Sequence, residues 1–142
     1  MNMEENVYFA YGSNMSEEQM AFRCPEAYII GKASVSGWEF KIMERGYATI
    51  IPSEDSVVWG VLWALSANDE RRLDRYEGVS AGLYTRDRIV VEMNGEQVEA
   101  LVYVAPLEAD GVASDAYMES VINGAEAFGF PTAYINEIRE AA

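Results

Sequence analysis

The amino-acid sequence predicts an α+β fold: a small mixed, mainly antiparallel β-barrel with flanking helices. Six or seven strand-like segments are joined mostly by hairpin turns, and helical patterns lie between them or follow them. The chain lacks the repeated strand–helix alternation of a doubly wound parallel sheet. Its 142 residues, half of them apolar, are enough to bury a core, so we expect residues 1–142 to form a single domain.

The N-terminal part begins with a short strand that leads through a turn into a helix. The run Val7–Tyr11 is strand-like and ends at a Gly-Ser-Asn turn. Ser16, with a glutamine three residues later, forms a capping box that starts a helix over Glu17–Phe22, and Pro25 stops it.

Extended segments make up the middle of the chain. We expect strands at Tyr28–Ser36, Trp38–Met43 and Tyr47–Ile51, with glycines at positions 31, 37 and 46 where bulges or bends would lie. The next run, Val57–Leu65, is apolar at nearly every position, which is typical of a central strand buried on both faces.

A polar helix and a hairpin follow. Ser66 is placed to cap a helix from Ala67 to Glu77, and Gly78 is placed to end it. An Asn-Gly pair, the strongest hairpin signal in the chain, joins the predicted strands Tyr84–Met93 and Glu96–Val104.

Two helices are predicted at the end of the chain. Ser114 is placed to cap a helix that continues to Phe128. One face of this helix carries Tyr117, Val121, Ala125 and Phe128, a spacing that favours burial against the barrel. Pro131 is typical of the first position of a last helix.

The charge of the chain excludes several classes of partner. Ten Lys and Arg residues against 24 Asp and Glu give a net charge of −14, and no basic cluster is present. Because clustered cations supply affinity for phosphate backbones and anionic lipids, we expect no nucleic acid and no membrane surface as a partner. The N-terminus has no basic, apolar leader pattern, so a cytoplasmic protein is expected.

Two near-absences limit the chemistry. The chain has no histidine, which excludes Ser-His-Asp and Cys-His nucleophile systems and His-ligated zinc. Its single cysteine, Cys24, cannot form an internal disulfide and is expected to be a partly buried thiol. Acid–base chemistry would need a carboxylate, a tyrosine, a lysine or a backbone group. Paired acids such as Glu17-Glu18 are interpreted as solvated turns, so no metal site is predicted.

The first candidate site is the turn that follows the first strand. A glycine-containing turn that leads into a helix can present successive backbone N–H groups beside the positive end of the helix dipole. This arrangement suits a carboxylate or a developing oxyanion. Gly12 permits close approach, and Ser13 and Asn14 can add hydrogen bonds. The alternative is an ordinary strand-to-helix turn with an Asn cap.

The second candidate is Glu77, in the last turn of the predicted helix. A carboxylate near the negative end of a helix dipole is destabilised by about 0.3–1 kcal/mol at an exposed site. This position and partial burial both raise a carboxyl pKa, which favours a general base near neutral pH. The alternative is a surface glutamate at a fraying helix end, paired with Arg75 or Arg86. Tyrosines that could line a pocket around these candidates are Tyr8, Tyr11, Tyr84 and Tyr117.

Five segments in this order resemble the gamma-glutamylcyclotransferase family, which includes the butirosin-pathway cyclotransferase and plant avirulence-induced-like proteins. They are YFAYGSN at 8–14, GYATI at 46–50, VVWGVLWAL at 57–65, LDRYEGVSAGLY at 73–84, and Tyr117 followed by NGAEAFGFP at 123–131. The resemblance covers about Val7–Ile138. The segment Arg45-Gly46-Tyr47 and the loop 105–113 differ from the family pattern.

The resemblance implies a small mixed β-barrel with a cavity beside the Tyr-Gly-Ser-Asn turn. It also implies that a small-molecule gamma-glutamyl substrate is cleaved to 5-oxoproline and a free amine, without a cofactor. The family's catalytic carboxylate falls on Glu77. Its substrate-binding positions fall on Tyr8, Phe9, Ala10, Tyr11, Gly12, Ser13, Asn14, Tyr84 and Tyr117. The Ser-Asn ending of the turn resembles the branch that acts on gamma-glutamyl amino acids, and the family permits a homodimer.

The implied chemistry is consistent with the missing histidines. The substrate's own α-amine would close a five-membered ring on the γ-carbonyl, so no nucleophile from the protein is needed. Glu77 would transfer the proton, and the N–H groups of Gly12–Asn14 would hold either the substrate carboxylate or the carbonyl oxygen. Two alternatives stay open: a cyclotransferase for a specialised gamma-glutamylated metabolite, and a non-catalytic binding protein of the same fold.

Overall fold

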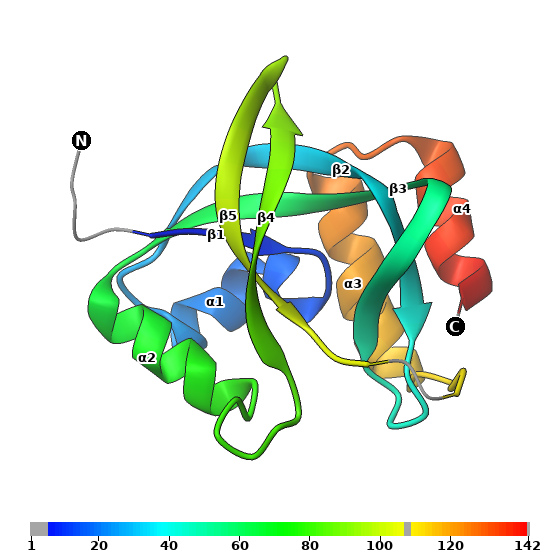
Figure 1. Cartoon of the computed structure of the whole chain (residues 1–142). Helices are drawn as coiled ribbons and strands as arrows, with labels where there is room; N and C mark the ends of the chain where they lie inside the picture. Colours follow the sequence, from blue (N-terminus) through cyan, green and yellow to red (C-terminus); the bar gives the residue numbers. More distant parts are fainter. Residues whose placement is uncertain (1–5, 107–108, 142) are drawn as a thin grey trace.

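A closed five-stranded barrel forms the centre of the computed structural model, which describes residues 6–106 and 109–141 (Figure 1). The strand order is β1-β3-β2-β4-β5. β1 runs parallel to β5, and the other strand pairs are antiparallel, which confirms the predicted mixed, mainly antiparallel barrel. The strands are β1 (Asn6–Ala10), β2 (Tyr28–Ile42), β3 (Ala48–Leu65), β4 (Thr85–Met93) and β5 (Glu96–Val104). Part of the 105–113 loop, at 107–108, lies outside the described residues.

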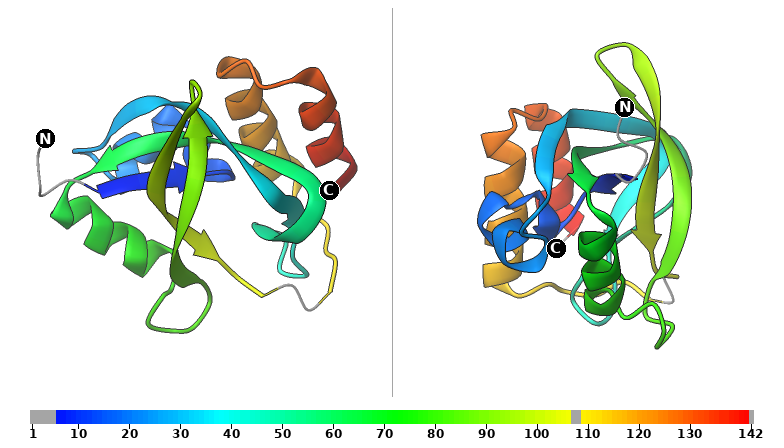
Figure 2. Two further views of the ribbon diagram at one scale, coloured as in Figure 1. Left: turned by 45° about the horizontal axis from the view of Figure 1, so that its top comes forward. Right: turned by 90° about the vertical axis from the view of Figure 1, so that its left-hand side faces the viewer.

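In the residues that the structure describes, four α-helices and one 3-10 turn flank the barrel. They are η1 (Ser13–Met15), α1 (Glu17–Arg23), α2 (Ala67–Tyr76), α3 (Asp115–Ala127) and α4 (Thr132–Ala141). The hydroxyls of Ser16, Ser66 and Ser114 each accept a hydrogen bond from the N–H three residues later, as the cap signals predicted. Helices α3 and α4 lie side by side on one face of the barrel, away from α2 (Figures 1 and 2). Within the described ranges, no helix has the length and apolar character needed to cross a membrane.

The strands are fewer and longer than the sequence suggested. The predicted strands Tyr28–Ser36 and Trp38–Met43 are one strand, β2, because a bulge at Gly37, with φ +86°, bends the strand without ending it. The predicted strands Tyr47–Ile51 and Val57–Leu65 are likewise joined in β3, since the residues between them stay extended. The expectation of six or seven strands was therefore wrong, and the described residues form five.

The second half of β3 is the central strand of the barrel, paired with β1 on one side and β2 on the other. Val58 and residues 60–65 are buried, as predicted for this strand, whereas Val57 is 38% exposed. Gly60 makes the close approach of β1 possible, because a Cβ at this position would lie 2.5 Å from the carbonyl oxygen of Ala10 and 2.7 Å from the ring of Phe9. The side chains of Phe9 and Ala10 are fully buried in the core. This packing holds the end of β1 in place, and with it the start of the turn that follows.

Candidate active site

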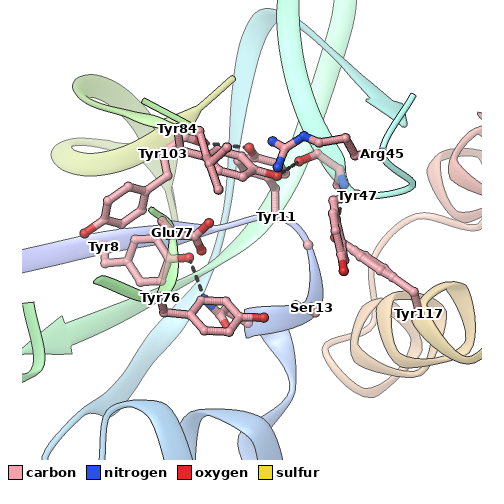
Figure 3. A pocket seen from close by; sticks show the side chains of 14 residues that line it. Tyr8, Tyr11, Ser13, Arg45, Tyr47, Tyr76, Glu77, Tyr84, Tyr103 and Tyr117 are labelled. Atoms are coloured by element: carbon pink, nitrogen blue, oxygen red, sulfur yellow. Dashed lines mark hydrogen bonds between the residues drawn. The ribbon is translucent and has the colours of Figure 1, made fainter. Parts of the chain in front are cut away.

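A cavity of about 240 Å³ lies where β1 runs into η1, facing the end of α2, the β2–β3 turn and the first turns of α3 (Figure 3). Tyrosines make up half of its lining. Among the described residues that line it, Glu77 is the one carboxylate and Arg45 the one cation. The lining consists of Tyr8, Tyr11, Gly12, Ser13, Asn14, Arg45, Tyr47, Ala48, Tyr76, Glu77, Leu83, Tyr84, Tyr103 and Tyr117.

Glu77 is held at the C-terminal end of α2 by a Schellman motif. The N–H groups of Gly78 and Val79 donate to the carbonyls of Arg75 and Asp74, each at 3.1 Å. Gly78 adopts the left-handed conformation that this motif requires, with φ +66°. The backbone of Glu77 is thus fixed on both sides, and its carboxylate lies among the tyrosine rings of the cavity (Figure 3).

Burial sets the proton affinity of this carboxylate. It raises the pKa of Glu77 from 4.5 to about 7, and the positive charge of Arg23 opposes the shift. In the part of the chain that the structure describes, no Lys or Arg nitrogen lies within 4.0 Å of the Glu77 carboxylate. The alternative pairing with Arg86 is not formed, since Arg86 pairs with Glu70 and Asp74. A carboxyl group with this pKa can both accept and donate a proton near neutral pH.

The turn after β1 is held in place by the side chain and carbonyl of Asn14. The Asn14 amide donates to the Tyr8 hydroxyl at 3.1 Å, and its side-chain oxygen accepts from Arg23. The indole N–H of Trp63 donates to the Asn14 carbonyl at 3.0 Å. Arg23 also donates to the Ser13 hydroxyl at 3.2 Å. The polar side-chain atoms of Asn14 are therefore already used within the protein, and they fix the position of the backbone beside the cavity.

Two pocket tyrosines are anchored on the backbone of Ala48. The Ala48 N–H donates to the Tyr117 hydroxyl at 3.1 Å, and the Tyr84 hydroxyl donates to the Ala48 carbonyl at 2.8 Å. Tyr117 accepts in this contact, so its own proton remains available for a bound molecule. Burial raises the pKa of Tyr117 to about 12 and that of Tyr84 further, so both stay protonated at neutral pH. A Cβ on Gly12 would lie 3.1 Å from the Tyr117 hydroxyl oxygen, which explains a glycine at this place.

The structure brings most of the predicted site residues together. Around this cavity lie Tyr8, Tyr11, Gly12, Ser13, Asn14, Glu77, Tyr84 and Tyr117. Phe9 and Ala10 do not line it, because their side chains point into the core. Strand alternation could have separated Phe9 from Tyr8, since successive side chains point to opposite faces.

Several lining residues were missed by the sequence analysis as site residues. Tyr76 and Leu83 lie beside predicted positions in the sequence, so proximity alone could have indicated them. Tyr103 comes from β5, and Arg45 and Tyr47 come from the β2–β3 turn, so only the barrel topology brings them here. Arg23 was also missed, although it contacts two residues of the first turn and its guanidinium lies 3.8 Å from the Tyr76 ring centroid.

The remaining candidates lie apart from this chemistry. Cys24 is a buried free thiol whose pKa burial raises to about 12, so it stays protonated. Over the described ranges, no three His, Cys, Asp or Glu side chains are grouped closely enough to hold a metal ion.

Residues 8–120 match the sequence model of the family described as gamma-glutamyl cyclotransferase, AIG2-like. The chain belongs to this family. It is 30% identical to the gamma-glutamylcyclotransferase of Mus musculus, with 96% of this chain and 78% of that protein covered. The Homo sapiens enzyme of the same name is 27% identical with the same coverage. A solved structure named gamma-glutamyl cyclotransferase superimposes with a TM-score of 0.89 at 26% identity, covering 96% of this chain and 87% of that one.

These similarities confirm three predictions made from the sequence: the family resemblance, the fold class and the enzyme type, a gamma-glutamylcyclotransferase. They give no role to any single residue of this chain.

Proposed function

We propose that the protein converts gamma-glutamyl amino acids to 5-oxoproline and a free amino acid, with Glu77 as the general acid and base. One observation carries the assignment of Glu77. It is the one carboxylate among the described lining residues, and burial brings its pKa to about 7. Such a group can take a proton in one step and return it in the next at neutral pH.

The substrate supplies the nucleophile. Glu77 takes a proton from the α-ammonium, and the freed amine attacks the γ-carbonyl carbon, forming the ring C–N bond. The attacking nitrogen loses a second proton to water, the amide C–N bond breaks, and protonated Glu77 gives its proton to the departing nitrogen. The released amine takes up its last proton from water. Intramolecular attack brings effective molarities up to about 10⁵–10⁸ M once the bound conformer is held, so positioning is the main task of the protein.

The other lining residues position and stabilise the substrate. Within the 3-10 turn the backbone N–H groups of Gly12–Asn14 have no partner and suit an anionic oxygen, and that of Ser13 faces the Tyr117 hydroxyl. They hold either the substrate α-carboxylate or the oxyanion that develops on the γ-carbonyl. The free proton of Tyr117 adds a donor beside them, and Tyr84 orients the glutamyl part from the opposite wall. Phe9 and Ala10 support the turn from the core.

The cellular setting proposed here follows from the sequence. A cytoplasmic location is part of this proposal, and the free thiol of Cys24 is compatible with it, because thiols stay reduced in that compartment. A net charge of −14 supports a small-molecule substrate over a nucleic-acid partner. A homodimer is compatible with the family and can be tested by sedimentation.

The experiment that tests this function measures 5-oxoproline release from a panel of gamma-glutamyl dipeptides, glutathione and gamma-glutamyl-lysine. We expect release from the dipeptides, and none from the same dipeptides acetylated on the α-amine, because acetylation removes the nucleophile. If the acetylated substrates are cleaved, the protein is an ordinary amidase and cyclisation is wrong. If no member of the panel is turned over, the proposed substrate class is wrong, and either a specialised metabolite or a binding role takes its place.

A further inference from the structure

We infer that Arg45 is a specificity-determining residue that binds the α-carboxylate of the departing amino acid. This inference rests on the proposed function and names the part of the substrate that the reaction itself does not use. The ring closure needs the α-amine and the γ-carbonyl only. A carboxylate on the departing group is therefore recognised by residues outside the acid–base and oxyanion positions, and Arg45 is the one cation among the described residues that line the cavity.

The position of Arg45 is fixed by the β2–β3 turn. The Met43 N–H donates to the Tyr47 carbonyl and the Gly46 N–H to the Met43 carbonyl, both at 2.8 Å. Gly46 has a φ of +87°, which lets the chain reverse directly after Arg45. The turn places the Arg45 guanidinium 6.0 Å from the centroid of the Tyr84 ring, at the edge of the cavity (Figure 3).

The guanidinium has no acidic partner in the protein. Among the described residues, no carboxylate oxygen lies within 4.0 Å of it. In the described part of the chain, Arg23, Arg71 and Arg75 likewise have no carboxylate within this distance, but Arg45 is the one of these arginines that lines the cavity. Four other arginines pair with carboxylates: Arg72, Arg86, Arg88 and Arg139. Arg45 therefore keeps its donors available for an external anion.

The two charged residues of the cavity, Glu77 and Arg45, differ in burial, and this difference would orient a bound substrate. Glu77 is partly buried, whereas Arg45 is exposed, so Arg45 lies nearer the solvent side of the cavity. The α-ammonium is drawn to the Glu77 carboxylate, which leaves the departing amino acid toward the solvent side. A guanidinium matches a carboxylate with two parallel N–H donors, and a ring face beneath it limits its freedom before binding.

If Arg45 binds this carboxylate, substrates that carry it should have a higher kcat/KM than substrates that lack it. Charge-assisted hydrogen bonds at an accessible site correspond to about a 10–100-fold difference in kcat/KM. We therefore expect gamma-glutamyl-L-alanine to be preferred by that factor over gamma-glutamyl-ethylamide. The two substrates have the same scissile amide and the same two-carbon group on the departing nitrogen. They differ only by the α-carboxylate, which is replaced by hydrogen in the ethylamide.

The test compares the ratio of kcat/KM for these two substrates in the wild type and in three variants. In Arg45→Gln the ratio is expected to fall by about 10–100-fold toward one, and Arg45→Lys should restore part of it. Arg139→Gln, on α4, removes the same charge away from the cavity and should keep the wild-type ratio. Thermal melts of the variants check that each one is folded.

The outcomes separate this inference from the proposed function. If the wild type releases 5-oxoproline from both substrates and Arg45→Gln leaves the ratio unchanged, the role of Arg45 is overturned while the cyclotransferase function stands. An equal fall with Arg139→Gln would also overturn it, because net charge alone would explain the preference. Release from neither substrate would count against the proposed function itself.

Discussion

The two sides of the cavity are built in different ways. On the inner side, Asn14 is 4% exposed and its amide and side-chain oxygen are both bonded within the protein. Glu77, also on this side, is fixed by the bonded end of α2. On the outer side, Arg45 and Tyr47 lie on an exposed turn, and in the described structure no ion pair or side-chain hydrogen bond holds either of them. In the proposed function, the reaction chemistry therefore lies on elements held by hydrogen bonds, and substrate selection lies on an exposed turn.

The largest effect that this comparison predicts is on turnover. Glu77→Gln keeps the shape and size of the side chain but removes the proton-accepting group. We expect kcat to fall by about 10²–10⁴-fold, the usual contribution of a general acid–base group. In the wild type, kcat/KM should rise with pH through about 7, because Glu77 must be ionised to accept the proton, and this limb should be absent in the variant.

The measurement is 5-oxoproline release by Glu77→Gln and by Glu140→Gln, an exposed change on α4, across pH 5–9. Glu140→Gln should retain the wild-type rate and pH profile. Near-wild-type turnover in Glu77→Gln would show that the inner side of the cavity does not carry the base.

A second, smaller effect concerns stability and has the opposite sign. The pKa of Glu77 is raised from 4.5 to about 7 on folding, so ionisation of this group disfavours the folded state. The cost is absent below pH 4.5, grows as the pH rises toward 7, and is complete above 7. Glu77→Gln should therefore be more stable than the wild type by up to about 3 kcal/mol at pH 8, and close to it at pH 4.

Urea unfolding of the wild type and Glu77→Gln at pH 4 and pH 8 gives this difference directly. The matched Glu140→Gln variant accounts for the general effect of removing one negative charge from an acidic protein. An inactive variant that gains no stability at pH 8 would mean that Glu77 is solvated in the folded protein, and that burial does not set its pKa.

The parts of the fold that were predictable depend on local interactions. The serine caps and the Asn94-Gly95 hairpin turn involve residues within a few positions of one another, and both were located correctly. The continuity of β2 through Gly37 depends on pairing with β3 rather than on local sequence, so one strand was read as two. The parallel contact of β1 with β5, which closes the barrel, joins residues more than 90 positions apart and has no local signal.

The residues of the site also differ in whether the local sequence or only the tertiary packing reveals them. Glu77 was recognisable because a carboxylate directly before a helix-ending glycine is unusual, whatever the rest of the chain does. The main cause of its raised pKa is burial by distant segments, which the helix end alone could not reveal. Arg23 and Tyr103 reach the site only through tertiary packing, and no feature of their own sequence neighbourhoods marks them.

The smallest predicted effect is on the free energy of unfolding, and it concerns two tyrosines whose rings are in contact. Tyr47, on the outer turn, and Tyr117, on α3, have ring centroids 5.4 Å apart. The Tyr117 hydroxyl accepts the Ala48 N–H, so Tyr117→Phe leaves that donor unpaired and should lower the free energy of unfolding by about 1 kcal/mol. Tyr47 is 52% exposed, and no hydrogen bond to its hydroxyl occurs among the described residues, so Tyr47→Phe should leave stability unchanged.

Urea unfolding of both variants and of the double variant at one pH tests this contrast. Because the ring contact survives both changes, the two effects should add, and the double variant should match Tyr117→Phe. Equal losses in the two single variants would mean that the outer turn is held as firmly as the inner side. The proposed division between a hydrogen-bonded reaction side and an exposed selection side would then be wrong.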